Sequence, residues 1–260
     1  MKAIHGGKAK HDKIDAQKIA ILRRGGPLPQ AYVYPAEMRA PRDLLRRRVH
    51  LMRQRAELLT PIQNTNSQYN RPEIGKKRAD KANRDGVAER CADPAVQKSI
   101  AVDLALIGQY DELRRDVELS ILKAAKQCPS HTLYLLRTVP GIGELLSLVL
   151  LYEIHDIQRL PRVQDVVPYC RLVKCAKESA GKRYGTSETK IGNASLKWAF
   201  SEAAGLFLRA NPAGQTYLGR LEKKPGRGKA LTVLAHKLAR AVYDMLPRHT
   251  AFDMHQFCTG

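Results

Sequence analysis

Cysteine is scarce in this sequence, which has five cysteines in 260 residues. Their spacing is irregular and includes no Cys-x-x-Cys pair; they are Cys91, Cys128, Cys170, Cys175 and Cys258. This spacing excludes a disulfide-stabilised scaffold and argues against a structural zinc site, which needs closely spaced ligand pairs. We therefore expect a cytoplasmic protein in which Cys170 and Cys175 are packing residues.

Long apolar runs are absent as well. The longest, Leu145 to Tyr152, contains Ser147 and is far shorter than the roughly 20 residues that a membrane-spanning helix requires. Residues 1–10 lack the apolar core of a signal peptide. The sequence therefore predicts no membrane association.

Acidic residues are few relative to basic ones. The chain has 25 Asp and Glu against 45 Lys and Arg, a formal net charge of +20. A surplus of this sign concentrates polyanions at a surface, so nucleic acid is the first partner to expect. Ribosomal proteins, membrane-surface proteins and heparin binders share such a balance, and the motifs have to decide between them.

Helical periodicity marks the first part of the chain. Residues 11–24 predict a short helix that stops at residues 25–27, Gly-Gly-Pro. Residues 36 to about 64 predict a second helix, which Pro61 ends or kinks. Its apolar face is formed by Leu45, Val49, Met52, Ala56 and Leu59.

The other face of this second helix is cationic. It carries Arg39, Arg42, Arg46, Arg47, Arg48, Arg53 and Arg55. Such a face can follow a phosphate backbone, or it can be an ordinary solvated helix surface. Both interpretations remain open from the sequence.

A polar segment, residues 66–98, predicts a linker and a boundary. An apolar stripe follows at spacings of three and four: Leu106, Tyr110, Leu113, Val117, Ile121 and Ala124. The stripe predicts a helix that packs against a second helix. A coiled coil and an intramolecular helical hairpin satisfy it equally.

A glycine-rich turn, residues 138–143, separates two apolar helical segments within residues 133–154. Gly141 and Gly143 permit a positive φ and close approach of a backbone, and the next helix begins with free amides. This helix–hairpin–helix pattern predicts DNA phosphate contact at Gly141 and Gly143. A purely structural tight turn is the alternative.

Residues 167–197 are basic and contain several glycines, which predicts a loop held close to phosphate between packed helices. Residues 196–208 and 230–246 predict the closing helices. The apolar face of the second is formed by Leu231, Leu234, Leu238, Val242 and Met245.

Several motifs occur in a characteristic order along the chain. They are Lys10–Ala16, Pro140–Gly143, Tyr169–Val173, Glu178–Lys182, Lys190–Asn193, Asn211-Pro212, Tyr217 and Ala235–Arg240. In this order they resemble the DEDD-type, RuvC-like insertion-sequence transposases of family one-hundred-and-ten, from residue 8 to about 246. The resemblance implies DNA transposition, Mg2+ as cofactor, double-stranded DNA at element ends and target, and a guide RNA. We also expect a homo-oligomer.

The resemblance implies that Ser179 is the nucleophile that attacks a DNA phosphodiester. A serine hydroxyl needs activation by a base or metal, and cations nearby to stabilise the transition state. Lys177, Lys182 and Arg183 are expected to supply that charge and to bind nucleic acid, together with Lys190. Judged alone, a serine in a polar glycine-rich loop is more simply a turn residue.

Asp12 and Asp15 match the closing Asp-x-x-Asp pair of the family's metal site. Carboxylates three residues apart share a helix face and can converge on Mg2+, although such a pair also suits a solvated helix start. The family's first Asp and its Glu lie on earlier strands, and this sequence begins after them. The resemblance therefore implies an N-terminally shortened chain in which Asp12 and Asp15 are vestigial ligands.

The overall prediction is a mainly α fold in four parts. Residues 1–34 are a remnant of an RNase-H-like, RuvC-like α/β domain; 35–127 a basic helical linker and coiled coil; 128–246 a helical C-terminal transposase domain with the helix–hairpin–helix; and 247–260 a tail. Two rivals remain: a non-catalytic nucleic-acid-binding protein, and a decayed fragment without a stable fold.

Overall fold

The computed structural model describes residues 12–26, 31–72, 83–126, 130–173, 175–179, 182–187, 192–223 and 226–259. These residues are mainly helical, which confirms the predicted fold class. The chain divides into two compact units, Met1–Pro35 and Ala36–Gly260. The first unit contains α1 (Asp12–Arg24), none of whose residues is buried. The proposed RNase-H-like ancestry of this unit stays a prediction.

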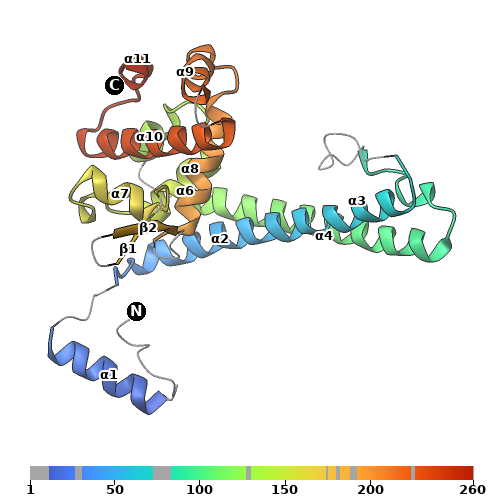
Figure 1. Cartoon of the computed structure of the whole chain (residues 1–260), viewed down its shortest axis with the longest axis horizontal. Helices are drawn as coiled ribbons and strands as arrows, with labels where there is room; N and C mark the ends of the chain where they lie inside the picture. The colour runs from blue at the N-terminus through green and yellow to red at the C-terminus, as the bar shows by residue number, and fades with distance from the viewer. Residues whose placement is uncertain are drawn as a thin grey trace. The chain divides into compact units, whose positions relative to one another are not determined.

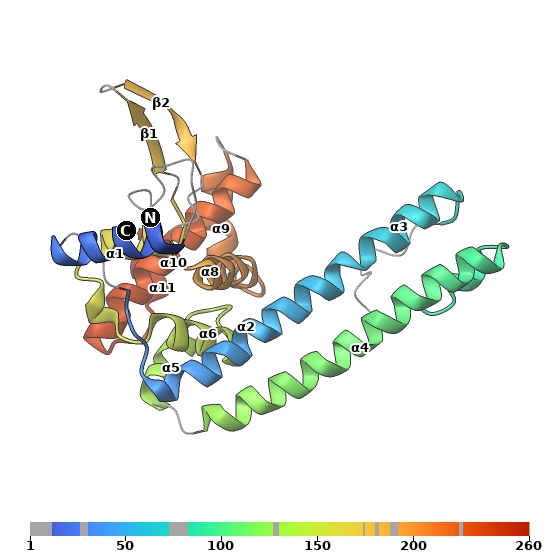
Figure 2. The same cartoon turned by 90° about the horizontal axis from the view of Figure 1, so that it is seen from below.

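The second unit begins with a long helical hairpin. In Figures 1 and 2, α2 (Ala36–Glu57) and α3 (Leu59–Gln68) run along α4 (Pro94–Ala125). Asp93 caps α4 by accepting hydrogen bonds from the amides of Ala95 and Val96. Of the two arrangements that the apolar stripe allowed, the structure contains the intramolecular hairpin.

The single helix predicted for residues 36–64 is two helices, with the break at Leu58. A proline ring clashes with the carbonyl four residues earlier, which for Pro61 is that of Glu57. The chain therefore leaves the helix ahead of Pro61. The proline then lies in the first turn of α3, where an amide donor has no intrahelical partner to lose.

The buried face of α4 differs from the predicted stripe. Ile121 of the stripe is buried as predicted, but Leu106 and Leu113 are 44% and 41% exposed, and Ile100 and Ile107, which lie outside the stripe, are buried. The inner face also carries Asp111 and Glu118, which accept hydrogen bonds from arginines of α2. The prediction was wrong here because apolar spacing alone does not recognise charged residues that are paired inside a helix–helix contact.

The segment predicted as a polar linker, residues 66–98, is partly buried. It contains the short 3-10 helix η3 (Ala88–Arg90), flanked by Val87 and Cys91. These two side chains belong to a separate apolar cluster in the hairpin, together with Ile62, Ala88, Ile100 and Ile107. The described part of the segment therefore helps to hold α3 against α4.

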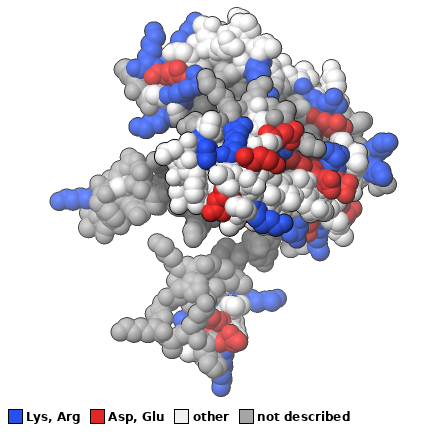
Figure 3. All heavy atoms as spheres, turned by 90° about the vertical axis from the view of Figure 1, so that its right-hand side faces the viewer, with Lys and Arg blue, Asp and Glu red and all other residues white. Residues whose placement is uncertain are grey.

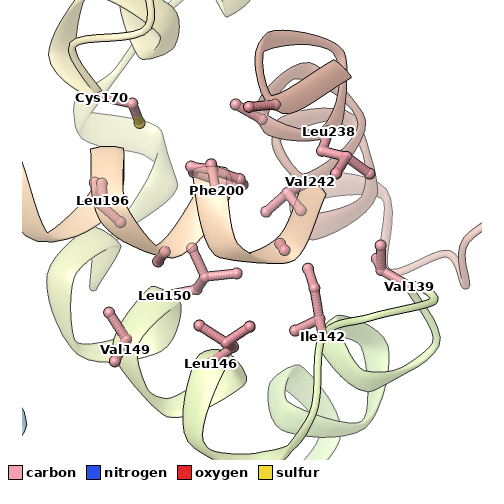
Figure 4. Packing of buried hydrophobic residues seen from close by; sticks show 14 of the residues in the cluster. Val139, Ile142, Leu146, Val149, Leu150, Cys170, Leu196, Phe200, Leu238 and Val242 are labelled. Atoms are coloured by element: carbon pink, nitrogen blue, oxygen red, sulfur yellow. The ribbon is translucent and has the colours of Figure 1, made fainter. Parts of the chain in front are cut away.

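The remaining helices form the main core of the second unit (Figures 1 and 4). They are α5 (Ser130–Arg137), α6 (Glu144–Ile154), η4 (Ile157–Arg159), α7 (Val163–Tyr169), α8 (Ala194–Phe207), α9 (Pro212–Glu222), α10 (Arg227–Arg248) and α11 (Met254–Thr259). Every residue from Leu146 to Ile154 is buried, so α6 is the central helix. Figure 4 shows Leu150, Phe200 and Val242 side by side, from α6, α8 and α10.

The last residues pack on this core. Phe257 of α11 is 5% exposed, and its ring centroid lies 5.3 Å from that of Phe207. The Phe252 amide donates to Thr138 Oγ1 over 2.9 Å. Cys170 is fully buried, and burial raises the pKa of its thiol to about 12, which confirms its prediction as a packing residue.

The predicted loop of residues 167–197 contains a β-hairpin. Its strands β1 (Cys175–Ser179) and β2 (Lys182–Ser187) pair antiparallel, with an irregularity between Lys177 and Glu178. Periodicity did not reveal the strands because they lack an alternation of apolar and polar residues. Figure 2 shows the hairpin projecting from the helices.

Across the described ranges, every helix is too short or too polar to cross a membrane.

Candidate nucleic-acid interface

The hairpin fixes the backbone position of Ser179. Ser179 is the last residue of β1 and pairs with Lys182, the first residue of β2, whose side chain is exposed. On the same strands Lys177 pairs with Gly185, and Arg183 pairs with Glu178. The structure thus brings four of the predicted site residues onto one hairpin, while Lys190 lies outside the described residues.

A buried carboxylate, Glu153 in the last turn of α6, lies where the helical hairpin meets the core. It is 1% exposed and accepts hydrogen bonds from Arg42 Nε at 2.9 Å, Arg46 Nε at 2.7 Å and Asn193 Nδ2 at 2.7 Å. Arg42 and Arg46 belong to α2, and Asn193 precedes α8. Glu153 therefore joins three elements that are far apart in the sequence.

These partners keep Glu153 ionised. Burial raises the pKa of this carboxyl, but hydrogen bonds from Arg46, Asn193 and Arg42 outweigh that effect and hold its pKa below the ordinary value. A buried charge without such partners would be strongly unfavourable. The arginines of α2 therefore position Glu153, and Glu153 in turn orients the arginines.

Asn193 and Gly192 fix the start of α8. The Asn193 side-chain oxygen accepts hydrogen bonds from the amides of Ser195 and Leu196, as an N-cap does. Gly192 has a φ of +99°, and a Cβ at this position would lie 2.6 Å from the Tyr169 carbonyl oxygen. Only glycine therefore allows α8 to begin so close to the end of α7.

A cleft of about 550 Å³ opens at this junction. It is lined by Arg42, Arg46, Tyr169, Arg171, Gly192, Asn193, Ala194 and Ser195. In the sequence, the arginines of α2 and the basic segment around Arg171 are separate features. Arg46 and Arg171 are more than a hundred residues apart and no motif links them, so only the fold brings them together.

Most arginines of the cationic face predicted for α2 form ion pairs with acidic side chains of the same protein. Arg42 and Arg46 pair with Glu153, Arg48 pairs with Glu118, and Arg55 pairs with Asp111. On the face shown in Figure 3, acidic and basic side chains of the described residues are interspersed. The α2 arginines therefore do not form one continuous track for phosphate.

The two glycines of the predicted helix–hairpin–helix have different surroundings. Gly141 has a φ of +85°, and a Cβ there would lie 2.4 Å from the backbone nitrogen of Phe207. Gly143, the N-cap of α6, is exposed, and a Cβ there would meet nothing within 4 Å. Packing of the turn against α8 is sufficient to require Gly141, and DNA contact at both glycines stays a prediction.

Asp12 and Asp15 lie in the first turn of α1, where the sequence placed them. Asp12 is exposed and Asp15 is half-buried. Among the residues that the structure describes, no three His, Cys, Asp or Glu side chains gather into a potential metal site. The two carboxylates are thus a pair on one helix, in a different compact unit from Ser179.

Known proteins identify the domain that carries the hairpin. Residues 133–219, from α5 to α9 and including Ser179, match the model of the Transposase IS116/IS110/IS902 family. The chain is also 30% identical over 129 residues to the insertion element IS110 uncharacterized 43.6 kDa protein of Streptomyces coelicolor (strain ATCC BAA-471 / A3(2) / M145). That match covers 50% of this chain and 31% of the relative, so the chain aligns with about a third of the relative's length.

Residues 133–219, which include the basic hairpin and much of the helical core, are therefore similar to a transposase domain. More specifically, the matches are to the IS116/IS110/IS902 family of insertion-sequence transposases, over about a third of the chain, and to an IS110 insertion-element protein. This confirms the resemblance that its motifs indicated.

Proposed function

We propose that this protein acts in DNA transposition by binding DNA and exchanging its strands, with Ser179 as the nucleophile. The observation that carries the proposal is the position of Ser179 at the end of β1, paired with Lys182, within the matched transposase domain. The net charge of +20 supports a polyanionic partner. Double-stranded DNA at the element ends and at the target is the proposed substrate, with a guide RNA as a further partner.

The proposed reaction is a transesterification at phosphorus. The Ser179 hydroxyl oxygen forms a bond to a DNA phosphorus, its proton is released, and the bond from phosphorus to one sugar oxygen breaks. That sugar oxygen takes up a proton and leaves as a hydroxyl. Attack by a hydroxyl of the second strand then restores the phosphodiester and frees Ser179. Lys177, Lys182 and Arg183 are proposed to balance the negative charge at phosphorus.

Mg2+ is the proposed cofactor, and Asp12 and Asp15, the two carboxylates that match the family's metal site, are the residues that would hold it. Their carboxylate oxygens are of the kind that Mg2+ prefers, and such sites often combine one or two carboxylates with waters and substrate phosphates. Bound there, the ion would neutralise phosphate charge.

Replacing Ser179 with alanine tests the nucleophile. The unaltered chain, incubated with element-end DNA, guide RNA and Mg2+, is expected to form a covalent protein–DNA adduct on a denaturing gel. Ser179→Ala should abolish the adduct because the attacking oxygen is removed, while Ser187→Ala, at the other end of the hairpin, should retain it. An undiminished adduct in Ser179→Ala would show that another group attacks.

The non-catalytic nucleic-acid-binding protein remains the second candidate. The basic cleft and net charge favour it equally, because neither requires bond breaking. Salt-dependent DNA binding by the unaltered chain, with no adduct under any of these conditions, would favour this candidate over the enzyme.

We further propose that the chain forms a homo-oligomer through the outer face of α4. Val102, Leu106 and Leu113 lie on this face at spacings of four and seven residues and are 47%, 44% and 41% exposed. Spacings of this kind suit helix–helix packing between copies. The double change Leu106→Lys/Leu113→Lys should convert an oligomer to a monomer in light scattering, because it places charge in the interface.

The matched control for this change is Val233→Lys, on α10, where the side chain is 44% exposed and far from α4 in the sequence. It should leave the molecular mass unchanged. Helix content by circular dichroism should stay the same in both variants. A monomeric unaltered chain, or an oligomer that survives the double change, would contradict the proposal.

A further inference from the structure

The cleft at the start of α8 is assembled from three separate parts of the chain. Arg42 and Arg46 come from α2, Arg171 follows α7, and Ala194 and Ser195 begin α8. Because α2 precedes the transposase domain matched at residues 133–219, the cleft exists only when the helical hairpin packs on that domain. The geometry points to a binding site for a backbone phosphate of a nucleic-acid strand, held by Arg42, Arg46 and Arg171.

The charge of the cleft supports an anionic occupant. Three guanidinium groups are part of its lining, and no carboxylate side chain is among the lining residues. A guanidinium group is planar and presents its N–H donors in a geometry that suits phosphate oxygens. The Arg46 side chain is 44% exposed and the Arg42 side chain 17%, so Arg46 is the more accessible to a ligand.

The start of α8 adds a second source of positive potential. The amino end of a helix carries a partial positive charge and commonly faces phosphate. Here α8 is 14 residues long, and its first residues, Ala194 and Ser195, line the same cleft as the arginines. The partial positive charge at the start of α8 and the charges of the arginines would therefore both attract an anion in the cleft.

Tyr169 favours a phosphate over a stacked base. Its hydroxyl accepts a hydrogen bond from Arg159 Nη2 at 2.8 Å, and the Arg159 guanidinium carbon lies 4.7 Å from the centre of its ring. One face of the ring is thus already covered by Arg159. The Tyr169 ring is therefore a fixed part of the cleft lining, and the groups that would bind a ligand are the cationic side chains.

The position of the cleft relates it to Ser179. Arg171 Nε donates to the Gly192 carbonyl oxygen over 3.0 Å, and these two residues lie on either side of the β-hairpin in the sequence. A strand whose phosphate occupies the cleft would therefore lie at the base of the hairpin. The inference rests on the proposed function, since it supplies the contact that delivers nucleic acid to Ser179.

The test compares two neighbouring arginines of α2. Arg46→Gln removes a cleft residue, and Arg47→Gln removes an exposed arginine with the same change in charge but outside the cleft lining. Affinity for a duplex DNA, a single-stranded DNA and an RNA of equal length is measured by fluorescence anisotropy at several salt concentrations. Thermal melting of each variant confirms the fold.

We expect Arg46→Gln and Arg171→Gln each to weaken binding about tenfold and to reduce the slope of log K against log salt on duplex DNA by about 0.9, the effect of one lost phosphate contact. Arg47→Gln should have a clearly smaller effect. Arg46→Lys, which keeps the charge but loses the planar group, should fall between the unaltered chain and Arg46→Gln.

Equal losses in Arg46→Gln and Arg47→Gln would overturn the inference, because only overall charge would then matter. An effect on the DNA alone, or on the RNA alone, supports the site and identifies whose phosphate it binds. Failure of the proposed function has a different signature. In that case the unaltered chain would bind none of the three probes, or it would bind them as above without a Ser179-dependent adduct.

Discussion

Gly141→Ala is expected to lower the free energy of unfolding by about 3 kcal/mol. An alanine with a φ of +85° costs about 1–2 kcal/mol. Its Cβ would also lie 2.4 Å from the Phe207 nitrogen and 2.7 Å from the Leu206 carbonyl carbon. Both neighbours are backbone atoms in the last turn of α8, so the helix itself has to move, and overpacking of this kind adds about 1–3 kcal/mol. Urea unfolding followed by circular dichroism measures the difference.

Gly143→Ala is the matched control, two residues further along the same turn. Gly143 has a negative φ and no atom within 4 Å of a built Cβ. Alanine is a poorer N-cap than glycine, so we expect a loss below about 1 kcal/mol. Equal losses at the two positions would refute the packing explanation for Gly141. Because Gly143→Ala should retain the fold, its effect on DNA affinity tests the predicted DNA contact separately from the effect on stability.

Glu153→Gln is expected to cost about 3 kcal/mol at neutral pH. Removing one partner of a buried ion pair typically costs about 3–5 kcal/mol, because the opposite charge is left without compensation. Here Arg42 and Arg46 lose their contacts with the Glu153 carboxylate. Because the Arg46 side chain is 44% exposed, water can solvate it, so we expect a cost at the lower end of this range. The midpoint of urea unfolding should fall without a change in slope. Asp165→Asn, which breaks the exposed pair with Arg162, should leave that midpoint unchanged.

The effect of Glu153→Gln should depend on pH in a defined direction. The pKa of Glu153 lies below its ordinary value of 4.5 in the folded protein, so its ionised form stabilises the fold at higher pH. That contribution is fully present above about pH 4.5 and is lost as the pH falls through the lower, folded-state pKa. The difference between the unaltered chain and Glu153→Gln should therefore shrink below pH 4.5. A difference that is constant from pH 7 to pH 3 would contradict this account.

The same unfolding curves decide the remaining rival, a decayed fragment without a stable fold. The buried cluster that joins α6, α8 and α10 predicts one cooperative transition for the main core. A broad, non-cooperative transition in the unaltered chain would favour the fragment.

Local pattern was sufficient for α6, α8 and α10 of the main core, whereas α7, α9 and α11 were not predicted. The apolar spacing of residues 230–246 predicted α10, and Leu234, Leu238 and Val242 are indeed buried. It was insufficient in the helical hairpin, where the paired carboxylates Asp111 and Glu118 occupy inner positions that periodicity assigns to apolar residues. It also missed the strands β1 and β2, whose polar residues give no alternating signal.

The amino-acid sequence by itself determined the mainly helical fold class, the excess of positive charge, and the resemblance to insertion-sequence transposases, because motif order and local periodicity are properties of neighbouring residues. The tertiary structure alone decided which arginines pair with internal carboxylates, and that Arg42, Arg46 and Arg171 line one cleft. It also decided why Gly141 must be glycine. The partners of Glu153 in α2 lie 107 and 111 residues away, and Gly141 meets α8 at Phe207. Contacts of this kind depend on how the helices pack, which no local pattern in the sequence encodes.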